Sequence, residues 1–488
     1  MNDLPKGWIL TEIGEISEYI QRGKSPKYID KSDLPVINQK CIRWDGVDPT
    51  YLKFIHPDQW DSWTPERFLQ SGDLLWNSTG TGTIGRAALF TELEGYERAV
   101  VDSHVTIVRC NTACHPYYLH YFIKSPFIQK RIEEMHTGST NQVELSRSEV
   151  LRTSIPLPPL GEQGRIVEKL DELLGRSRRA REELQQIPKL IQRYKQAVLA
   201  AAFRGDLTAD WRDKNKPDLS VNCPTLDNDQ INNLSSLPED WIWVTINQVA
   251  KVIGGLAKSH NRASLEKTVP YLRVANVYAN ELRLDEVLEI GISETEWKRV
   301  KLNSGDLLIV EGNGSIDQIG RVALWSGEIE NCAHQNHLIK VRVGDLVFEK
   351  FALYWLLSPI GRLAIELVAS SSSGLHTLSL SKVSALPLPL CSIPEQKEIV
   401  QRVEERFKAI ETIEQNYQKA IALLDRLDQA TLAKAFRGQL VPQDPNDEPA
   451  SVLLERIRAD RTQQPTPRKR KPKATQLSLD CPSASAGT

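Results

Sequence analysis

The sequence predicts an α+β fold in which two tandem globular domains are each followed by a long helix. Three observations predict this architecture. The chain repeats itself at one main shift that drifts only inside the globular parts, short apolar runs mix with helical stretches in each copy, and a heptad pattern follows each copy. At 488 residues the chain is also too long for one compact core, because a domain takes roughly 150 residues.

The repeat emerges when the chain is aligned with itself so that Leu4 falls on Leu237. The same shift matches Leu-Pro-x-x-Trp at 4–8 and 237–241, Ser-Gly-Asp-Leu-Leu at 71–75 and 304–308, Glu-Gln at 162–163 and 395–396, and Ala-Phe-Arg-Gly at 202–205 and 435–438. Between these segments the side chains differ almost completely. We therefore expect two domains that share a scaffold and recognise two different things.

Each globular copy mixes strand-like and helix-like patterns, which predicts α+β domains. The apolar runs bounded by turns are 73–76, 105–108, 306–310 and 338–343, and the helical stretches are 117–135 and 348–369. A Pro-x-Pro segment at 156–158 and again at 387–389 should end each domain, because proline continues neither a helix interior nor a strand ladder.

A heptad seam follows each copy. From Ile166 to Ala201, the positions at alternating steps of four and three are apolar or small, and the second copy keeps the seam from Ile399 to Leu427 with Arg406 as its flaw. A helix of about 40 residues is ~60 Å long, more than the width of one domain. We expect the two helices to pair as an antiparallel coiled coil with an approximate two-fold axis. Packing of each stripe on its own domain is the alternative.

Three residues mark breaks in these helices. Pro188 lies in the middle of the first helix and should bend it or remove a hydrogen bond. Gly205 and Gly438 lie where a helix end is expected.

Composition restricts the class of protein. No apolar run approaches the length of roughly 18 residues that a membrane helix needs, and the opening residues lack a signal-peptide pattern, so we expect a cytoplasmic protein. The seven cysteines lack CxxC pairing, and the clusters near Cys110 and Cys332 lack zinc-ligand spacing. In the cluster near Cys332, only His337 has a counterpart in the other copy, His104. No metal site is therefore expected.

The net charge of -2 is low for a free-standing DNA-binding protein, so basic charge must be local or supplied by a partner. The one dense basic run, 468–473, lies in a tail rich in Pro, Ser and Thr. A solvated, disordered tail is the simplest interpretation, and non-specific phosphate contact is the other.

Motifs for catalysis or nucleotide binding are weak or absent. Gly80–Gly85 matches GxGxxG, but the second copy breaks the spacing and a strand rather than a helix is expected to follow. Gly23-Lys24-Ser25 resembles the end of a P-loop, yet Glu18 occupies the place of the first glycine. No hydrolase, zinc-protease or methyltransferase signature is present, so the chain is expected to be non-catalytic.

Two polar loops in each copy are candidate DNA-contacting surfaces, since Asn, Gln and Arg can bond to base edges and glycine lets the backbone approach closely. The candidates are Asn77, Ser78, Thr79, Thr81, Thr83 and Arg86 in the first copy and Asn313, Ser315, Asp317, Gln318 and Arg321 in the second, with Arg22, Lys24 and Lys27 and Lys258, His260 and Arg262 in the early loops. An ordinary hairpin loop and solvated charges are the alternative interpretations.

The chain resembles the specificity subunits of type I restriction-modification systems. The segments that carry this resemblance are Leu-Pro-x-x-Trp at the start of each half, IPLPPLGEQ at 155–163, AAAFRGDLT at 200–208 and LVPQDPNDEPA at 440–450. It spans nearly the whole chain and leaves out the tail after Arg461. It implies two target-recognition domains, each reading one half of a bipartite, asymmetric DNA sequence, with the helices setting the gap.

The resemblance also implies partners. These are two modification subunits that methylate adenine with S-adenosylmethionine and restriction subunits that use ATP and Mg²⁺; this chain itself would hold no cofactor. The ends of the helices, around Phe203 and Phe436, are expected to bind the partners, with core packing of these rings as the alternative.

The expected segments follow from the repeat and the resemblance. They are target-recognition domain 1 at 1–157, the first spacer helix at 158–210, a linker at 211–234, target-recognition domain 2 at 235–390, the second spacer helix at 391–440, a C-terminal segment with a short helix at 441–462, and a basic tail at 463–488. Alternative functions are a coiled-coil adaptor for proteins, a subunit of a fused methyltransferase-nuclease system, and a self-contained enzyme.

Overall fold

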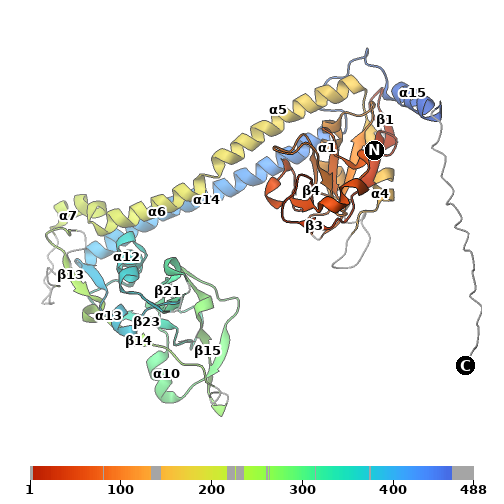
Figure 1. The fold of residues 1–488 in the computed structure, drawn as a ribbon. Coiled ribbons are helices and arrows are strands. Elements are labelled where there is room, and N and C mark those ends of the chain that lie inside the picture. Colours follow the sequence, from red (N-terminus) through yellow and green to blue (C-terminus); the bar gives the residue numbers. More distant parts are fainter. Residues whose placement is uncertain are drawn as a thin grey trace, which may run out of the picture. The chain divides into compact units, whose positions relative to one another are not determined.

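The computed structural model describes residues 4–80, 82–132, 144–216, 226, 236–259, 262, 264–313, 315–372 and 375–463 (Figure 1). The chain divides into two compact units. Unit 1 comprises 1–181 and 421–488, and unit 2 comprises 182–420. Each unit therefore holds one globular domain together with parts of the long helices of both copies.

Domain 1, within unit 1, is built on two four-stranded sheets with orders β2-β11-β8-β9 and β10-β4-β7-β3. The first sheet is antiparallel, whereas β10 and β4 are parallel. β1 pairs with β12, so the first and last strands of the domain lie together. The elements are β1 (Ile9–Glu12), β2 (Ser17–Arg22), β3 (Tyr28–Ile29), β4 (Pro35–Ile37), β5 (Ile42–Arg43), β6 (Gly46–Val47), β7 (Lys53–Ile55), β8 (Leu74–Asn77), β9 (Ala87–Leu89), β10 (Val100–Val101), β11 (Val105–Cys110), α1 (Pro116–Lys124), α2 (Pro126–Gln129), α4 (Arg147–Arg152) and β12 (Ser154–Leu157).

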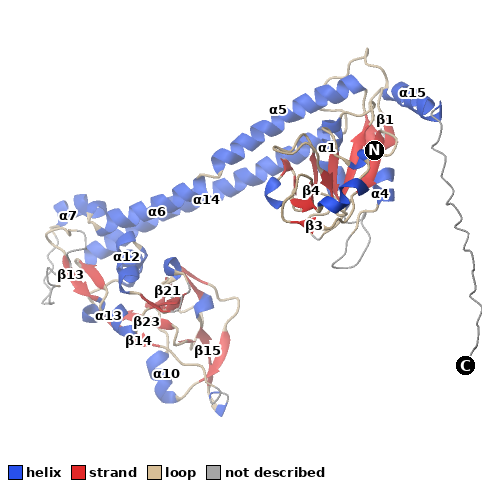
Figure 2. Ribbon diagram, viewed as in Figure 1, coloured by secondary structure: helices blue, strands red, loops and turns tan. Residues whose placement is uncertain are grey.

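Domain 2, within unit 2, likewise combines strands and helices (Figure 2). It repeats the four-stranded antiparallel sheet, but its second sheet has three strands, β18-β15-β22, and it has a further sheet, β20-β25-β24. Its antiparallel sheet has the order β14-β23-β19-β21, β15 and β22 are parallel, and β13 pairs with β26. The elements are β13 (Ile242–Thr245), α9 (Ile246–Val249), β14 (Ala250–Gly254), β15 (Thr268–Leu272), β16 (Val277–Tyr278), β17 (Glu281–Leu282), β18 (Leu288–Gly291), α10 (Glu294–Val300), β19 (Asp306–Val310), β20 (Gly312–Asn313), β21 (Val322–Trp325), β22 (Ala333–His334), β23 (Leu338–Val343), α11 (Glu349–Leu357), α12 (Pro359–Val368), β24 (Ser370–Ser372), β25 (Leu375–Thr377), α13 (Leu380–Ser384) and β26 (Pro387–Leu390). The tandem domains predicted from the repeat are present.

The repeated Ser-Gly-Asp-Leu-Leu segment makes the same turn and strand in both domains. Gly72 and Gly305 both have a φ of 93°, which favours glycine. The next residue, Asp73, accepts two hydrogen bonds from Arg109 at 2.7 and 2.8 Å, and Asp306 accepts two from Arg342 at 2.6 and 2.7 Å. The two leucines that follow are fully buried in the central strand of the sheet. This segment is therefore repeated because it fixes a turn, an ion pair with a buried aspartate and a core strand.

The repeated tryptophan and Glu-Gln segments attach each domain to the helix that follows it. Trp8 Nε1 donates to Glu162 at 3.0 Å, and Trp241 Nε1 donates to Glu395 at 3.1 Å. The glutamine after each glutamate, Gln163 or Gln396, uses both ends of its side-chain amide. The oxygen accepts from a backbone N–H, and the nitrogen donates to two backbone carbonyls, at distances between 2.7 and 3.0 Å. Both glutamate-glutamine pairs are buried.

The long helices begin where the Pro-x-Pro segments end. The first is interrupted: α5 spans Leu160–Leu184 and α6 spans Ile187–Phe203, with Pro188 in the first turn of α6, as the sequence predicted. The second, α14, runs from Ile393 to Ala435 without a break. Two shorter helices, α7 (Ala209–Asn215) and α15 (Ala450–Gln463), follow them.

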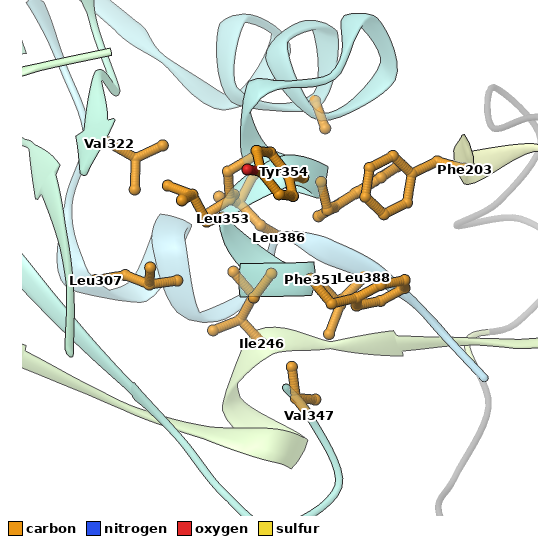
Figure 3. Close-up of a cluster of buried hydrophobic side chains, with 14 of the residues drawn as sticks. Phe203, Ile246, Leu307, Val322, Val347, Phe351, Leu353, Tyr354, Leu386 and Leu388 are labelled. Carbon is orange, nitrogen blue, oxygen red and sulfur yellow. The ribbon is translucent and has the colours of Figure 1, made fainter. Parts of the chain in front are cut away.

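The end of each long helix packs into a domain core. In unit 2, Phe203 at the end of α6 lies in the cluster that holds Phe351 (Figure 3). Its ring contacts those of Phe351 and Trp355, with centroid distances of 5.2 and 5.3 Å. In unit 1, Phe436, just after α14, makes the equivalent contacts with Tyr118 and Phe122 at 5.3 and 5.2 Å. The domain cores are thus completed by a helix end.

The glycine of the repeated Ala-Phe-Arg-Gly segment ends each helix. Gly205 and Gly438 have φ values of 79° and 67°. A Cβ atom at either position would lie 2.3 Å from the ring of a proline, Pro238 or Pro5, in the opening Leu-Pro-x-x-Trp segment. Only glycine therefore fits this junction.

Three positions of the predicted heptad seam are exposed. Tyr194, Ile413 and Leu427 keep 51%, 50% and 55% of their surface accessible. Other seam positions are buried. Ile166, Leu170, Ile399 and Val403 pack into the domain cores, and Ser177, Ile191 and Ile410 are buried farther along the helices.

Among the described residues, no single helix is long and apolar enough to cross a membrane; α11 and α12, bent by 72°, reach that length and composition only when taken together.

Candidate nucleic-acid interface

The loop after β8 in domain 1 rests on two buried polar residues. Asn77 Nδ2 donates to the Gln39 carbonyl at 3.1 Å, and Ser78 Oγ lies 2.5 Å from Thr106 Oγ1. Both side chains have no accessible surface. They therefore hold the loop in place. The sequence predicted that these side chains contact base edges, which they cannot reach in this conformation. Thr81 lies outside the described residues.

The rest of this loop lies nearer the surface. Thr79 Oγ1 lies 2.6 Å from His104 Nδ1, and Thr83 Oγ1 donates to the Gly80 carbonyl at 3.2 Å. Arg86 donates to the carbonyls of Ile42 and Gly82 at 3.4 and 3.3 Å. Arg86 thus connects the loop to the β5–β6 hairpin while remaining partly exposed.

The early loop of domain 1 meets the loop after β8 at the turn formed by residues 102–104. Arg22 Nε donates to the Ser103 carbonyl, and its guanidinium pairs with Glu144. Lys24 Nζ donates to the Ser62 carbonyl at 3.0 Å and lies 5.5 Å from the centroid of Trp63. Lys27 is exposed. Candidates that are far apart in the sequence therefore lie together.

Arg262, in the early loop of domain 2, is held by its own domain. Its guanidinium donates to the carbonyls of Ala257 and Gly291 at 2.6 and 3.1 Å and to Glu296 at 2.8 Å. The hydrogen bond from Arg262 lowers the pKa of Glu296 to about 2. Arg262 therefore fixes this loop to α10, and its side chain is not presented to DNA as predicted. Lys258 is exposed, and His260 lies outside the described residues.

The loop after β19 forms part of a small sheet. Asn313 pairs through its backbone with His376, and Gln318 N donates to the Ser315 carbonyl at 3.1 Å. Ser315 is exposed. The side chains of Asn313 and Asp317 lie outside what the structure describes.

In domain 2, Arg321 is the counterpart of Arg86 of domain 1. Its guanidinium carbon lies 4.7 Å from the centroid of Tyr278, and a terminal nitrogen donates to the Val274 carbonyl at 3.5 Å. Arg283 lies on the same ring at 3.9 Å. Both shared arginines therefore bind the segment around the hairpin next to their loop, β5–β6 in domain 1 and β16–β17 in domain 2.

Sequence reasoning missed three residues of these surfaces. Tyr278 and Arg283 carry no motif, and only the folded hairpin brings them to Arg321. The repeat matched His104 with His337, but neither was counted among the DNA-contacting candidates.

Phe203 and Phe436, predicted to bind partners, are completely buried. Both rings fill a domain core, which agrees with the alternative of core packing, and their contact with a partner stays a prediction.

The comparisons with known proteins agree with this architecture. The model of the protein family described as "Type I restriction modification DNA specificity domain" matches residues 5–189 and 238–421, one region for each copy. The chain belongs to this family. It is a specificity subunit, and specificity subunits are the non-catalytic, DNA-recognising subunits of type I restriction-modification systems.

Relatives of this specificity subunit match over most of its length. The EcoKI specificity subunit of Escherichia coli K12 is 27% identical over 94% of this chain and 96% of its own. The EcoBI specificity subunit of Escherichia coli is 33% identical over 67% of this chain and 68% of its own. The StySPI specificity subunit of Salmonella potsdam is 27% identical over 94% of this chain and 96% of its own.

Two solved structures share the fold. A chain from a study of complex assembly and conformational transition in the type I system has a TM-score of 0.65 at 20% identity, covering 90% of this chain and 100% of that one. The HsdS subunit of Thermoanaerobacter tengcongensis has a TM-score of 0.53 at 20% identity, covering 90% and 98%.

Proposed function

We propose that this specificity subunit reads a bipartite, asymmetric DNA sequence, with one half-site for each domain. The observation that carries the proposal is the division of the repeat. The turn, the buried ion pair and the helix junction recur in both domains, whereas the loops after β8 and β19 have different side chains. A constant scaffold with two different surfaces suits two different half-sites.

Within those surfaces, we propose separate roles for the candidate residues. Exposed Lys27, Lys258 and Ser315 are candidates for direct DNA contact. Asn77, Ser78 and Arg262 are buried or bonded to backbone, so they shape the loops that carry the contacts. Arg86 and Arg321 can do both, because they hold the neighbouring segment and remain partly exposed.

We propose that the spacer helices pair as an antiparallel coiled coil and thereby set the gap between the half-sites, related by an approximate two-fold axis. Contacts within each unit support this pairing. In unit 2, Lys195 pairs with Glu414 at 2.9 Å, and farther along, Asp210 pairs with Arg402. Residue numbers rise on one partner and fall on the other, which is the antiparallel pattern. In unit 1, Arg181 pairs with Asp425 and Asp428, each at 2.8 Å.

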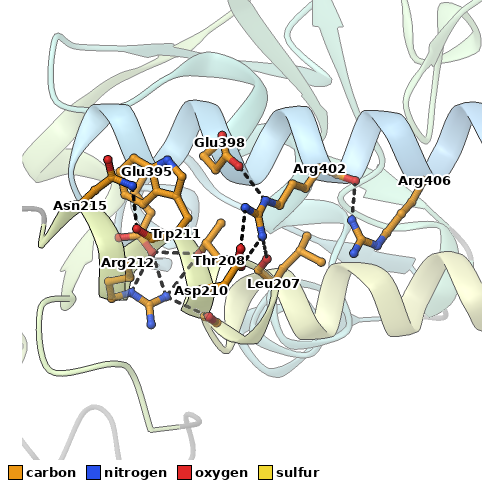
Figure 4. Close-up of polar contacts among 11 residues, drawn as sticks. Leu207, Thr208, Asp210, Trp211, Arg212, Asn215, Glu395, Glu398, Arg402 and Arg406 are labelled. Atoms are coloured by element: carbon orange, nitrogen blue, oxygen red, sulfur yellow. Dashed lines mark hydrogen bonds and ion pairs between the residues drawn. The ribbon is translucent and has the colours of Figure 1, made fainter.

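Helices that are joined rigidly to the domains would fix the length of the gap between the half-sites. In unit 2, the buried Glu395 accepts hydrogen bonds from Thr208 and Arg212 at 2.9 Å each, and Arg402 pairs with Asp210 and Glu398 (Figure 4). These bonds connect the segment after α6 to the start of α14. They support a fixed orientation of domain 2 on the helices.

We propose that two modification subunits and the restriction subunits assemble on this chain, and that adenine methylation with S-adenosylmethionine and ATP-dependent cleavage belong to those partners. Exposed apolar side chains on the helices are candidate contacts in place of the buried phenylalanines: Leu190, Tyr194, Ile413, Leu423 and Leu427. Such a complex would act on DNA in the cytoplasm.

The test is methylation by the assembled complex. The chain is co-expressed with its modification subunits, and the complex methylates a library of random duplexes whose methylated adenines are then mapped by sequencing. We expect one motif made of two different half-sites separated by a gap of fixed length. A single uninterrupted motif, or methylation without sequence preference, would contradict the proposal.

A further inference from the structure

Two histidines stand at equivalent positions in loops that otherwise differ. His104 closes the turn Asp102-Ser103-His104, and His337 closes the turn Gln335-Asn336-His337, which aligns with it in the repeat. The histidine is the only residue that the two turns share. Each turn lies beside the loop that follows the central strand of its domain, β8 or β19.

The backbone around the two histidines is the same. Ser78 N donates to the His104 carbonyl, and Glu311 N donates to the His337 carbonyl, both at 2.9 Å. A glycine packs against each turn: a Cβ atom would lie 2.2 Å from the Asp102 carbonyl at Gly23, and 2.2 Å from the Gln335 carbonyl at Gly255. The fold therefore places both histidines at the same point of their domains.

Each imidazole is oriented by a different side chain that contacts the same ring nitrogen. His104 Nδ1 lies 2.6 Å from Thr79 Oγ1, and His337 Nδ1 lies 3.1 Å from Glu311 Oε2. Neither Nε2 has a hydrogen-bond partner among the described residues. His337 is exposed and His104 is partly exposed, so each ring presents Nε2 as its available polar atom.

We propose that His104 and His337 are the sequence-independent DNA contacts of the two domains, each donating from Nε2 to a backbone phosphate. This inference rests on the proposed function. Two domains that read different half-sites need a common residue only for what the half-sites share, and the phosphate backbone is shared by every sequence. Donation to a phosphate needs a proton on Nε2. In His104 this is the tautomer in which Nδ1 accepts from Thr79 Oγ1, and in His337, where Nδ1 faces the Glu311 carboxylate, it is the ring with a proton on both nitrogens.

A partner subunit present in two copies could also require a common residue, but the location favours DNA. The residues around the two turns differ between domains, and in domain 1 the cation Arg22 lies on the same turn. A partner present twice would need a repeated surface, and the repeated tryptophan-glutamate contacts lie at the helix junctions instead.

The test uses two substitutions that separate the ring nitrogens. His→Asn keeps a polar group near Nδ1 and loses Nε2, whereas His→Gln keeps a donor near Nε2. The substitutions are made at His104 and at His337 in the full chain assembled with its modification subunits. Dissociation constants are measured on a duplex with the recognised sequence and on a duplex with one half-site scrambled, with His56→Asn as the control on the surface of domain 1.

We expect each His→Asn variant to raise the Kd roughly three- to tenfold on both duplexes, the effect of one lost hydrogen bond, and each His→Gln variant to recover most of the affinity. Wild-type affinity in the His→Asn variants, or a loss confined to one duplex, would overturn the phosphate contact. Loss of the modification subunits would assign the histidines to the partner and also overturn it. A wild-type complex that does not distinguish the two duplexes would instead contradict the proposed function.

Discussion

A buried glutamate lies in the first turn of each spacer helix, and the two glutamates differ in the groups that bond to their carboxylates. Glu395 accepts bonds from Trp241, Thr208 and Arg212, so both of its carboxylate oxygens have partners. Glu162 accepts only from Trp8, and its Oε1 is buried without a partner among the described residues. The alignment of the two copies explains this difference, because Val441 and Pro445 occupy the positions of Thr208 and Arg212.

We expect the two glutamates to respond differently to replacement by glutamine. Glu395→Gln removes a buried charge-assisted contact and leaves Arg212 without its anion, so unit 2 should lose about 2–3 kcal/mol of stability. Glu162→Gln keeps the acceptor for Trp8 and removes a poorly compensated charge, so unit 1 should change by less than about 1 kcal/mol. Hydrogen exchange of peptides from each unit measures both. Equal losses in the two units would contradict this account.

Burial also raises the pKa of Glu162 above its ordinary value of 4.5. The folded chain therefore holds this proton more tightly than the unfolded chain, and the resulting stabilisation is present below pH 4.5 and is lost as the pH rises through the folded pKa. The Glu162→Gln variant should lack this part of the pH dependence.

Phe203 permits a test of core packing against partner contact. Phe203→Ala should destabilise unit 2 by about 3–5 kcal/mol, because it leaves a cavity beside Phe351 and Trp355. Phe203→Leu keeps most of the volume and should assemble with modification subunits as the wild type does. A folded Phe203→Leu chain that fails to assemble would show that the ring itself touches the partner.

At the scale of elements, the helices carry the spacing hypothesis. Inserting one heptad into α6 and one into α14 lengthens each helix by ~10 Å while keeping the apolar pattern in phase. The gap between half-sites should grow by about three base pairs, and the half-sites themselves should not change. Mapping of methylated adenines gives the answer. The control is an insertion in α6 alone, which puts the two helices out of register. An unchanged gap in the variant with both insertions would contradict the proposal that the helices set the gap.

The elements were also the part of the fold that the sequence predicted best. The heptad pattern and the Pro-x-Pro segments depend on local spacing, so the helices begin within a few residues of the expected positions, and the break near Pro188 was expected. The candidate site was predicted less well, because burial depends on distant segments. Nothing near Arg262 in the sequence reveals that Glu296 will pair with it, and nothing near Asn77 reveals the Gln39 carbonyl.

The whole molecule divides into constant and variable parts. The constant parts are the turn at Gly72 and Gly305, the buried ion pairs and the junctions of Trp8 and Trp241 with the helices. The variable parts are the loops that we propose to meet DNA. If this division is correct, a domain can be exchanged at its junction without disturbing the other domain.

The exchange of domain 1 is the most direct test of that claim. Residues 1–157 are replaced by the corresponding segment of a specificity subunit with a different target, the hybrid is assembled with modification subunits, and methylated adenines are mapped. We expect one half-site to change to that of the donor, while the other half-site and the length of the gap remain. A change in both half-sites, or in neither, would contradict it.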